Sequence, residues 1–204
     1  MRTIEVFADV ACPFTHVGLR RLVDHREQAG QGPRIVVRSW PLELVNGTPL
    51  AADLVAHEAA DLRAQVAPDL FAGLDPAAFP TTSLPAMALT VVAYRTSIEV
   101  GEAVALALRW AVFEEGRDTG DPAVLAAIAA AHGLGGADDA AREQVLADWD
   151  EGKARGVVGS PHFLVGDEGF FCPGLDIHRE GEHFAISPDV EGFAAFVRRA
   201  FGED

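Results

Sequence analysis

The sequence predicts an α/β fold in which a long helical insertion separates two groups of strands. The chain opens with a strand, a helix and a second strand, an order typical of parallel strands joined by a right-handed crossover. From about residue 50 to residue 152 it is rich in alanine and leucine and has few strand signals. Strand-like runs return after residue 159 and are followed by a last helix. The predicted order is therefore β–α–β, a helical block, and β–β–α.

Size and composition indicate a soluble globular protein. The chain has 204 residues, of which 49% are hydrophobic and 23% are charged, a balance that excludes a disordered chain. This length suffices for one domain with a substantial core or for two small ones. The net charge of −15 argues against nucleic acid and anionic membranes as partners, because both repel a surface of like sign.

The N-terminal stretch MRTIEVFADV is charged and alternating, where a signal peptide would have a long apolar core. No run approaches the roughly 20 apolar residues that span a bilayer. We therefore expect a cytoplasmic protein, whose thiols stay mostly reduced. Its two cysteines cannot form a disulfide framework. The oligomeric state stays open, with a homodimer among the options.

The first three elements follow from local patterns. Ile4–Val10 carries β-branched and aromatic residues and predicts a strand. A helix is predicted from about Phe14 to Gln28, with Pro13 in its first turn, where the missing N–H is not needed. The run RIVVRSWPLEL predicts a second strand that Pro41 ends.

The middle of the chain predicts several helices. The run GEAVALALRWAVFEEG is apolar nearly all round, which indicates a helix buried on several sides. In DPAVLAAIAAAHGL, Asp121 suits an N-cap, Pro122 the first helical position and Gly133 the end. Three large side chains are predicted to belong to the core: Trp40, Leu42 and Trp110. For Leu42 the alternative is that it lines a cleft between the sheet and the helical block.

The last third of the chain predicts a hairpin and a helix. Phe163–Val165 and Phe170–Cys172 flank the turn-forming run GDEG. A final helix is predicted to start at Ser187-Pro188. Its apolar residues recur at helical spacing and are predicted to be buried: Phe193, Phe196, Val197 and Phe201.

Cys12 is the main candidate for chemistry. It lies where the first strand ends and the first helix begins, so the helix dipole and unpaired backbone N–H groups favour its thiolate. This position predicts a pKa below the ordinary value of about 8.5. Thr15 is close enough to donate a hydrogen bond to the sulfur, but it cannot close a disulfide. The pattern suits a nucleophile that forms mixed disulfides or binds a small thiol; an inert buried cysteine is the alternative.

Other residues are candidates for supporting roles. His16 shares a helix face with Cys12, where it would lower the pKa of the thiol as an imidazolium or pass protons as a neutral ring. Phe14 is expected to be exposed beside the thiol and to contact substrate. Ser160-Pro161 precedes a strand, a place that accepts proline and permits a cis bond. No metal site is expected, because Cys12 and His16 have no further ligands at a recognisable spacing.

Four stretches in this order resemble the DsbA family of thioredoxin-fold proteins, in particular its FrnE-like branch. They are DVACPFTHVGLRRL, SWPLEL, the helical block and GVVGSPHFLV, and the resemblance covers nearly the whole chain. It implies a thioredoxin-like domain of residues 1–48 and 153–204, with an all-α domain of residues 49–152 inserted. It also implies that Cys12 is the nucleophile and that a cis-proline loop faces it. The residues that would bind substrate are Pro13, Phe14, Ser160 and Pro161.

The chain departs from the family pattern at the second cysteine, which is Thr15 here. This departure resembles monothiol relatives, and also kappa-class glutathione transferases and 2-hydroxychromene-2-carboxylate isomerases, which contact a glutathione thiolate. Many thioredoxin-like proteins keep a buried acid six residues before the nucleophile, where this chain has Val6. Asp9 is nearer to Cys12 and is expected to order the turn.

Cys172 ends the last predicted sheet strand, and on a thioredoxin-like topology that end lies on the side of Cys12. We therefore hypothesise a non-local resolving or redox-sensing thiol, which requires Cα atoms within about 7 Å for a disulfide. A small packed residue is the alternative.

The sequence thus predicts a DsbA-like thiol–disulfide oxidoreductase that acts through mixed disulfides of Cys12. Its partner would be a disulfide-containing protein or a small-molecule thiol. No tightly bound cofactor is expected; glutathione or mycothiol would be the low-molecular-weight thiol. The alternatives are a glutathione-transferase-like or isomerase-like enzyme and a non-catalytic binding protein.

Overall fold

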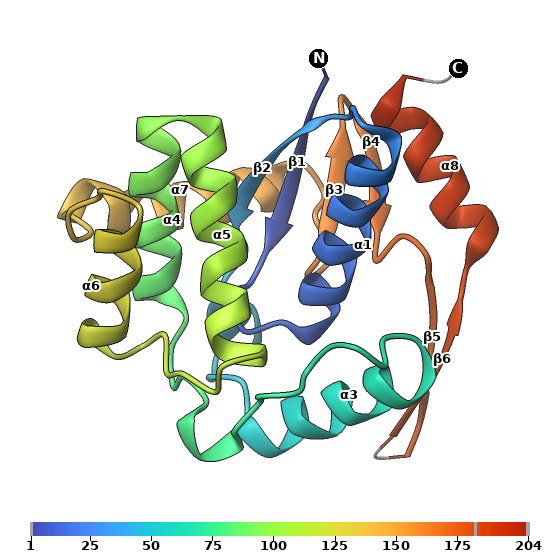
Figure 1. Ribbon diagram of the computed structural model, residues 1–204, viewed down its shortest axis with the longest axis horizontal. Coiled ribbons are helices and arrows are strands. Elements are labelled where there is room, and N and C mark those ends of the chain that lie inside the picture. Colours follow the sequence, from blue (N-terminus) through green and yellow to red (C-terminus); the bar gives the residue numbers. More distant parts are fainter. Residues whose placement is uncertain (1, 182, 203–204) are drawn as a thin grey trace.

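The computed structural model describes residues 2–181 and 183–202, and a four-stranded sheet in the order β2-β1-β3-β4 forms its centre (Figure 1). β1 and β2 are parallel and joined through α1, which confirms the predicted opening unit. β3 is antiparallel to both β1 and β4. The elements of this layer are β1 (Thr3–Ala8), α1 (Pro13–Ala29), β2 (Arg34–Ser39), β3 (His162–Val165) and β4 (Glu168–Phe171).

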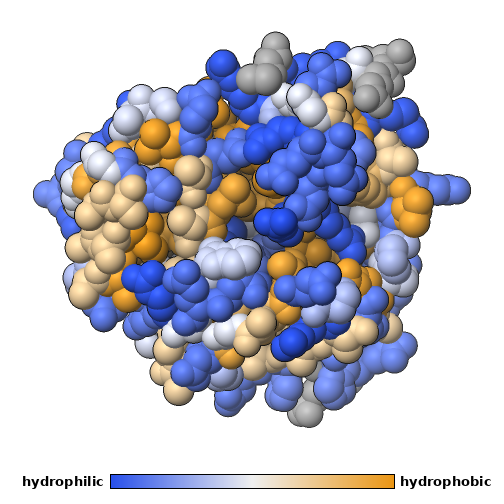
Figure 2. Space-filling view, in the orientation of Figure 1, coloured by the Kyte–Doolittle hydropathy of each residue, from blue (hydrophilic) through white to orange (hydrophobic). Residues whose placement is uncertain are grey.

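α1 begins and ends where its sequence allows. Pro13 occupies its first turn, where a missing N–H costs no hydrogen bond. Gly30 closes the helix in the left-handed conformation, with φ of 66°, and its N–H bonds to the carbonyl of Glu27. Hydrophilic residues cover the outward side of α1 in Figure 2, while its inner side packs on the sheet.

The segment between β2 and β3 is helical, as predicted. It contains α2 (Leu42–Asn46), α3 (Ala52–Gln65), the 3-10 helix η1 (Pro76–Ala78), α4 (Leu84–Thr96), α5 (Ile98–Phe113), α6 (Pro122–Ala131) and α7 (Asp139–Ala154). Asp121 caps α6 by accepting a hydrogen bond from the N–H of Ala123. Trp110 was predicted to be core, but its exposed fraction is 46% because it lies on the outer side of α5. Trp40 is buried and Leu42 is half-buried.

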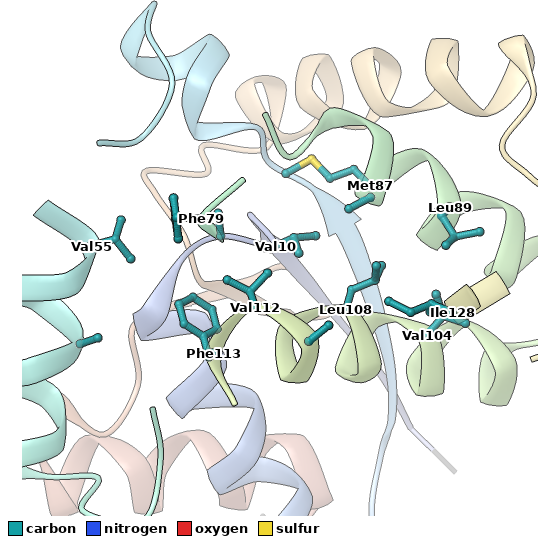
Figure 3. Close-up of a cluster of buried hydrophobic side chains, with 14 of the residues drawn as sticks. Val10, Val55, Phe79, Met87, Leu89, Val104, Leu108, Val112, Phe113 and Ile128 are labelled. Atoms are coloured by element: carbon teal, nitrogen blue, oxygen red, sulfur yellow. The ribbon is translucent and has the colours of Figure 1, made fainter. Parts of the chain in front are cut away.

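A hydrophobic cluster joins the insertion to the start of α1. Val10 and Ala11 of the β1–α1 loop belong to the same buried cluster as α3, α4 and α5. Figure 3 shows Val10 beside the face of α5 that carries Leu108 and Val112. The division of the chain into two domains stays a prediction, and this packing couples the two parts directly at the β1–α1 loop that leads to Cys12.

The last quarter of the chain differs from the prediction. A second hairpin, β5 (Leu175–Glu180) with β6 (His183–Pro188), precedes α8 (Val190–Phe201). The predicted helix start at Ser187-Pro188 is wrong, because both residues end β6 and Asp189 caps α8 by accepting from the N–H of Gly192 at 2.9 Å. Phe196 and Val197 are buried, whereas Phe193 and Phe201 are only half-buried.

The first hairpin has a tighter turn than predicted, since Glu168 already pairs with Val165 and only Gly166 and Asp167 form the turn. Within the described residues, no helix is long and apolar enough to cross a membrane.

Candidate active site

Cys12 lies at the N-cap of α1, at the end of the loop that follows β1. Its side chain is buried, with an exposed fraction of 3%. The Sγ–H donates to the backbone carbonyl of Ser160 at 3.2 Å. The thiol of Cys12 is thus held against the loop before β3.

The loop before β3 is brought to Cys12 by the pairing of β1 with β3. His162 pairs with Phe7, so Ser160 and Pro161 continue alongside the residues that follow β1. The Ser160–Pro161 peptide bond is cis, as the resemblance implies. The hydroxyl of Ser160 accepts from the N–H of Asp9 at 2.9 Å and shares a hydrogen bond of 2.8 Å with the hydroxyl of Thr15. These two buried hydrogen bonds fasten the cis-proline loop to Asp9 and Thr15, which precede and follow Cys12.

The protonation of Cys12 differs from the prediction. Burial raises the pKa of the Cys12 thiol above its ordinary value, although hydrogen bonds from the Thr15 and Ser160 side chains and the Thr15 backbone favour the thiolate. The cause is desolvation, which disfavours a charged sulfur more than the helix terminus stabilises it. Donation to the Ser160 carbonyl favours the protonated form as well. Burial and this hydrogen bond therefore both favour the thiol of Cys12 over its thiolate.

Glu58 of α3 is a charged neighbour of Cys12 that sequence reasoning missed. It is half-buried, and burial raises its pKa to about 7. Its negative charge also raises the pKa of Cys12. α3 lies across the N-terminal end of α1, and its Asp61 and Gln65 bond to Phe184 and Ile186 of β6 (Figure 1). Sequence reasoning missed Glu58 because nothing distinguishes it from the other polar residues of α3.

Asp9 and Arg109 form a second buried polar group at the β1–α1 loop. The Asp9 carboxylate accepts from the N–H of Ala11 at 2.8 Å, the N–H of Leu42 at 2.7 Å and the hydroxyl of Ser83 at 3.1 Å. It therefore orders the turn, as expected, and also ties that turn to the insertion. Arg109 donates to the backbone carbonyl of Asp9 at 3.1 Å. The sequence did not point to Arg109, because a single cation in an apolar helix ordinarily marks its exposed side.

Cys172 lies on the side of the sheet where Cys12 lies. It follows β4, and its N–H donates to the carbonyl of Pro161 at 3.1 Å. Both cysteines are free thiols. Cys172 is buried, and desolvation together with the charge of Cys12 raises its pKa strongly. This proximity keeps the resolving-thiol hypothesis open, but burial makes Cys172 a weak nucleophile.

His16 and Phe14 both pack against other aromatic rings. The Nε2 of His16 bonds to Glu114 at 2.8 Å, and its ring stacks on Phe113 with a centroid separation of 5.0 Å. Phe14 was expected to be exposed, but it is half-buried because its ring packs edge-on against Phe184 of the unpredicted β6. Pro13 is buried in the first turn of α1.

The arrangement suits thiol chemistry. Among residues 2–181 and 183–202, no group of three or more histidine, cysteine or acidic side chains is placed to hold a metal ion. A thiol at a helix N-terminus opposite a cis-proline loop has the parts needed to attack a disulfide once it is deprotonated. Thr15 contributes a hydroxyl and no second sulfur.

Comparisons with known proteins agree with this geometry. A family model described as the DSBA-like thioredoxin domain matches residues 3–179. A 2-hydroxychromene-2-carboxylate isomerase is 18% identical, with a TM-score of 0.59 over 83% of this chain and 88% of that one. No curated protein sequence matches this chain.

Two further solved structures share the fold. A Streptomyces coelicolor protein assigned as a DsbA oxidoreductase is 22% identical, with a TM-score of 0.63 over 100% of this chain and 92% of that one. A Nitrosomonas europaea protein assigned as a protein disulfide isomerase is 15% identical, with a TM-score of 0.63 over 98% of this chain and 95% of that one.

Proposed function

The chain belongs to the DSBA-like thioredoxin domain family, and on that premise we propose that it is a thiol–disulfide oxidoreductase working through Cys12 alone. One observation carries the proposal. The Cys12 thiol lies at the N-terminus of α1 and bonds to the Ser160 carbonyl beside a cis-proline, while Thr15 occupies the place of a second cysteine. We propose that Pro13, Phe14, Ser160 and Pro161 border the substrate.

The proposed reaction has two exchange steps. The Cys12 thiolate attacks one sulfur of a disulfide R–S–S–R′, so that a Cys12–S–S–R bond forms and R′–S⁻ leaves and takes a proton. Thr15 cannot displace the bound sulfur. A low-molecular-weight thiol, X–SH, therefore attacks the R sulfur of the mixed disulfide. This second exchange returns the Cys12 thiol and releases R–S–S–X, with no net electron transfer to the protein.

The state of the thiol favours one direction of exchange. A thiol with a raised pKa is a poor leaving group, so a mixed disulfide at Cys12 is released slowly. Strong oxidants of this kind instead depend on a stabilised thiolate. We therefore propose thiol transfer or reduction rather than the introduction of disulfides into proteins. Glutathione and mycothiol belong to the thiol class that the second step needs, and their abundance in a reducing compartment makes the cytoplasm the proposed location.

Turnover of a small disulfide in the presence of excess reduced thiol tests the proposal. We expect Cys12→Ser to abolish turnover, because serine cannot form the mixed disulfide. Cys172→Ala is the matched control and should retain activity within about twofold, since Cys172 is buried and strongly protonated. Full turnover by Cys12→Ser would overturn the single-cysteine mechanism.

One observation favours a second candidate, a glutathione-dependent transferase or isomerase. Cys12 lies beside the hydroxyls of Thr15 and Ser160, which also bond to each other, and such a site would orient the thiolate of a cofactor instead of supplying its own. In that case Cys12→Ser would keep activity with added glutathione and Thr15→Val would lose it. A non-catalytic binding protein would show no turnover in any variant.

A further inference from the structure

We infer that Phe184 of β6 is a specificity-determining residue that limits Cys12 to low-molecular-weight disulfides. The groups of the candidate site are covered in this structure, and the exposed fractions of Cys12, Thr15 and Ser160 are 3%, 0% and 8%. Exchange requires direct contact between the Cys12 sulfur and a disulfide sulfur. One of the elements packed around Cys12 must therefore move before the reaction, and that element decides which disulfides enter.

β6 packs against the residues that precede and follow Cys12. Val10, two residues before Cys12, lies in the same hydrophobic cluster as Ile186 of β6. Phe14, two residues after Cys12, meets the ring of Phe184 edge-on, with a centroid separation of 5.9 Å. Both of these rings pack against that cluster as well. The ring of Phe184 therefore covers the turn of α1 that begins at Cys12.

β6 can move without disturbing the central sheet, because it pairs only with β5 in a separate two-stranded sheet. Where β6 meets the C-terminal half of α3 (Figure 1), the N–H of Phe184 donates to Asp61 and its carbonyl accepts from Gln65, both at 2.8 Å. The N–H of Ile186 donates to Gln65, also at 2.8 Å. Ile186 is the one buried residue of β6. Side-chain contacts thus hold β6 over α1, whereas β1 and β3 are fixed by strand pairing.

The size of the opening depends on how much of this cover is displaced. Two neighbours hold the ring of Phe184, namely Phe14 and the guanidinium of Arg179, which lies 5.8 Å from the ring centroid. Withdrawal of this one ring breaks few contacts and uncovers a narrow path to Cys12, whereas a disulfide in a folded protein requires displacement of the whole strand. Because an open state becomes rarer with each contact that it breaks, narrow openings dominate. Phe184 therefore favours low-molecular-weight disulfides over protein disulfides.

This inference rests on the proposed function only in taking Cys12 as the nucleophile, and its test does not use turnover. The test compares two reagents of the same chemistry, N-ethylmaleimide and a maleimide carried on a long polyethylene glycol chain, and maps the modified cysteine. We expect Phe184→Ala to accelerate modification of Cys12 by the large reagent about tenfold and by the small reagent less than about threefold. The small reagent gains less because narrow openings already admit it.

Two controls separate access to Cys12 from a general loss of stability. Phe201→Ala also removes a half-buried ring that packs edge-on against α1, at His25 with a centroid separation of 5.0 Å. Because that contact lies towards the C-terminal end of α1, both rates should stay within about twofold of wild type. Cys172 is buried in the same molecule and should stay unmodified in every variant.

An unchanged rate for the large reagent in Phe184→Ala would overturn the inference. Equal acceleration of both reagents, modification of Cys172 in step with Cys12, or the same effect in Phe201→Ala would also overturn it, since each result would mean general loosening. If Phe184→Ala does not fold, Gln65→Ala removes two bonds that hold β6 and keeps the ring, and the large reagent should gain about threefold over the small one. No gain in that variant would overturn the inference. Selective access without turnover of a small disulfide would contradict the proposed function alone.

Discussion

Ser160→Ala removes a hydroxyl that forms two buried hydrogen bonds. The hydroxyl accepts from the N–H of Asp9 at 2.9 Å and shares a bond of 2.8 Å with Thr15. A buried N–H left without a partner costs about 1–3 kcal/mol, and the second bond contributes about 0.5–1.5 kcal/mol. We therefore expect Ser160→Ala to lower the free energy of unfolding by about 1.5–4.5 kcal/mol.

The assay is urea unfolding at pH 7 with two companion variants. Thr15→Val removes the bond to the Ser160 hydroxyl and the Thr15 contact with Cys12, but leaves the bond from the N–H of Asp9 to Ser160 in place. It should cost about 0.5–1.5 kcal/mol. Ser187→Ala makes the same substitution at an exposed position and should stay within about 0.5 kcal/mol of wild type. Because Ser160 and Thr15 share one bond, the double variant should cost less than the two single variants added together.

The reasoning would be refuted if Ser160→Ala were as harmless as Ser187→Ala. Strict additivity of the Ser160 and Thr15 variants would also contradict it, since that result would mean that the two hydroxyls do not interact. Either outcome would mean that the Ser160 hydroxyl does not hold the cis-proline loop against the residues on either side of Cys12.

Two further sites carry predictions. Glu58→Gln should lower the pKa of Cys12, and we expect alkylation at pH 8 to become about threefold faster; slower alkylation would contradict the stated charge effect. Glu58 has a folded-state pKa of about 7 against 4.5 for the free group, so its stabilising effect is complete below pH 4.5 and is lost as pH rises through 7. Urea unfolding should show wild type losing about 2 kcal/mol more than Glu58→Gln between pH 5 and pH 8. Glu114→Ala leaves His16 and the N–H of Phe71 without their acceptor and should cost about 2–4 kcal/mol in the same assay. It should leave the alkylation midpoint of Cys12 unchanged, and a shifted midpoint would restore His16 as a group that acts on the thiol.

The elements that were predicted correctly are those marked by the spacing of nearby residues in the sequence. The first strand, α1 and β2 were predicted because hydrophobic spacing and Pro13 mark them directly. The β5–β6 hairpin was missed because its residues are mostly polar and exposed, and the alternation of burial in β5 covers only its first four residues. Its absence from the prediction also made Phe14 look exposed, since Phe184 of β6 covers one side of that ring.

The candidate site was predicted in position but not in electrostatics. Cys12 and the cis-proline loop meet because β1 pairs with β3. The predicted order of β–α–β followed by β–β is compatible with this pairing. The pKa of Cys12 depends on its burial, which is a property of the tertiary structure and not of the local sequence. Glu58 affects Cys12, and Arg109 reaches the carbonyl of Asp9, only through tertiary packing, so no motif or spacing indicates them.

The most direct test of the account is the intact mass of reduced protein after exposure to a small-molecule disulfide, with remaining thiols alkylated and the modified peptide mapped. The account predicts one adduct of the small thiol, carried by Cys12, with Cys172 recovered as a free thiol. An internal bond between Cys12 and Cys172 would contradict the single-cysteine mechanism and make this a dithiol protein with a displaced partner. Absence of any product at Cys12 would contradict the central claim that Cys12 is the nucleophile.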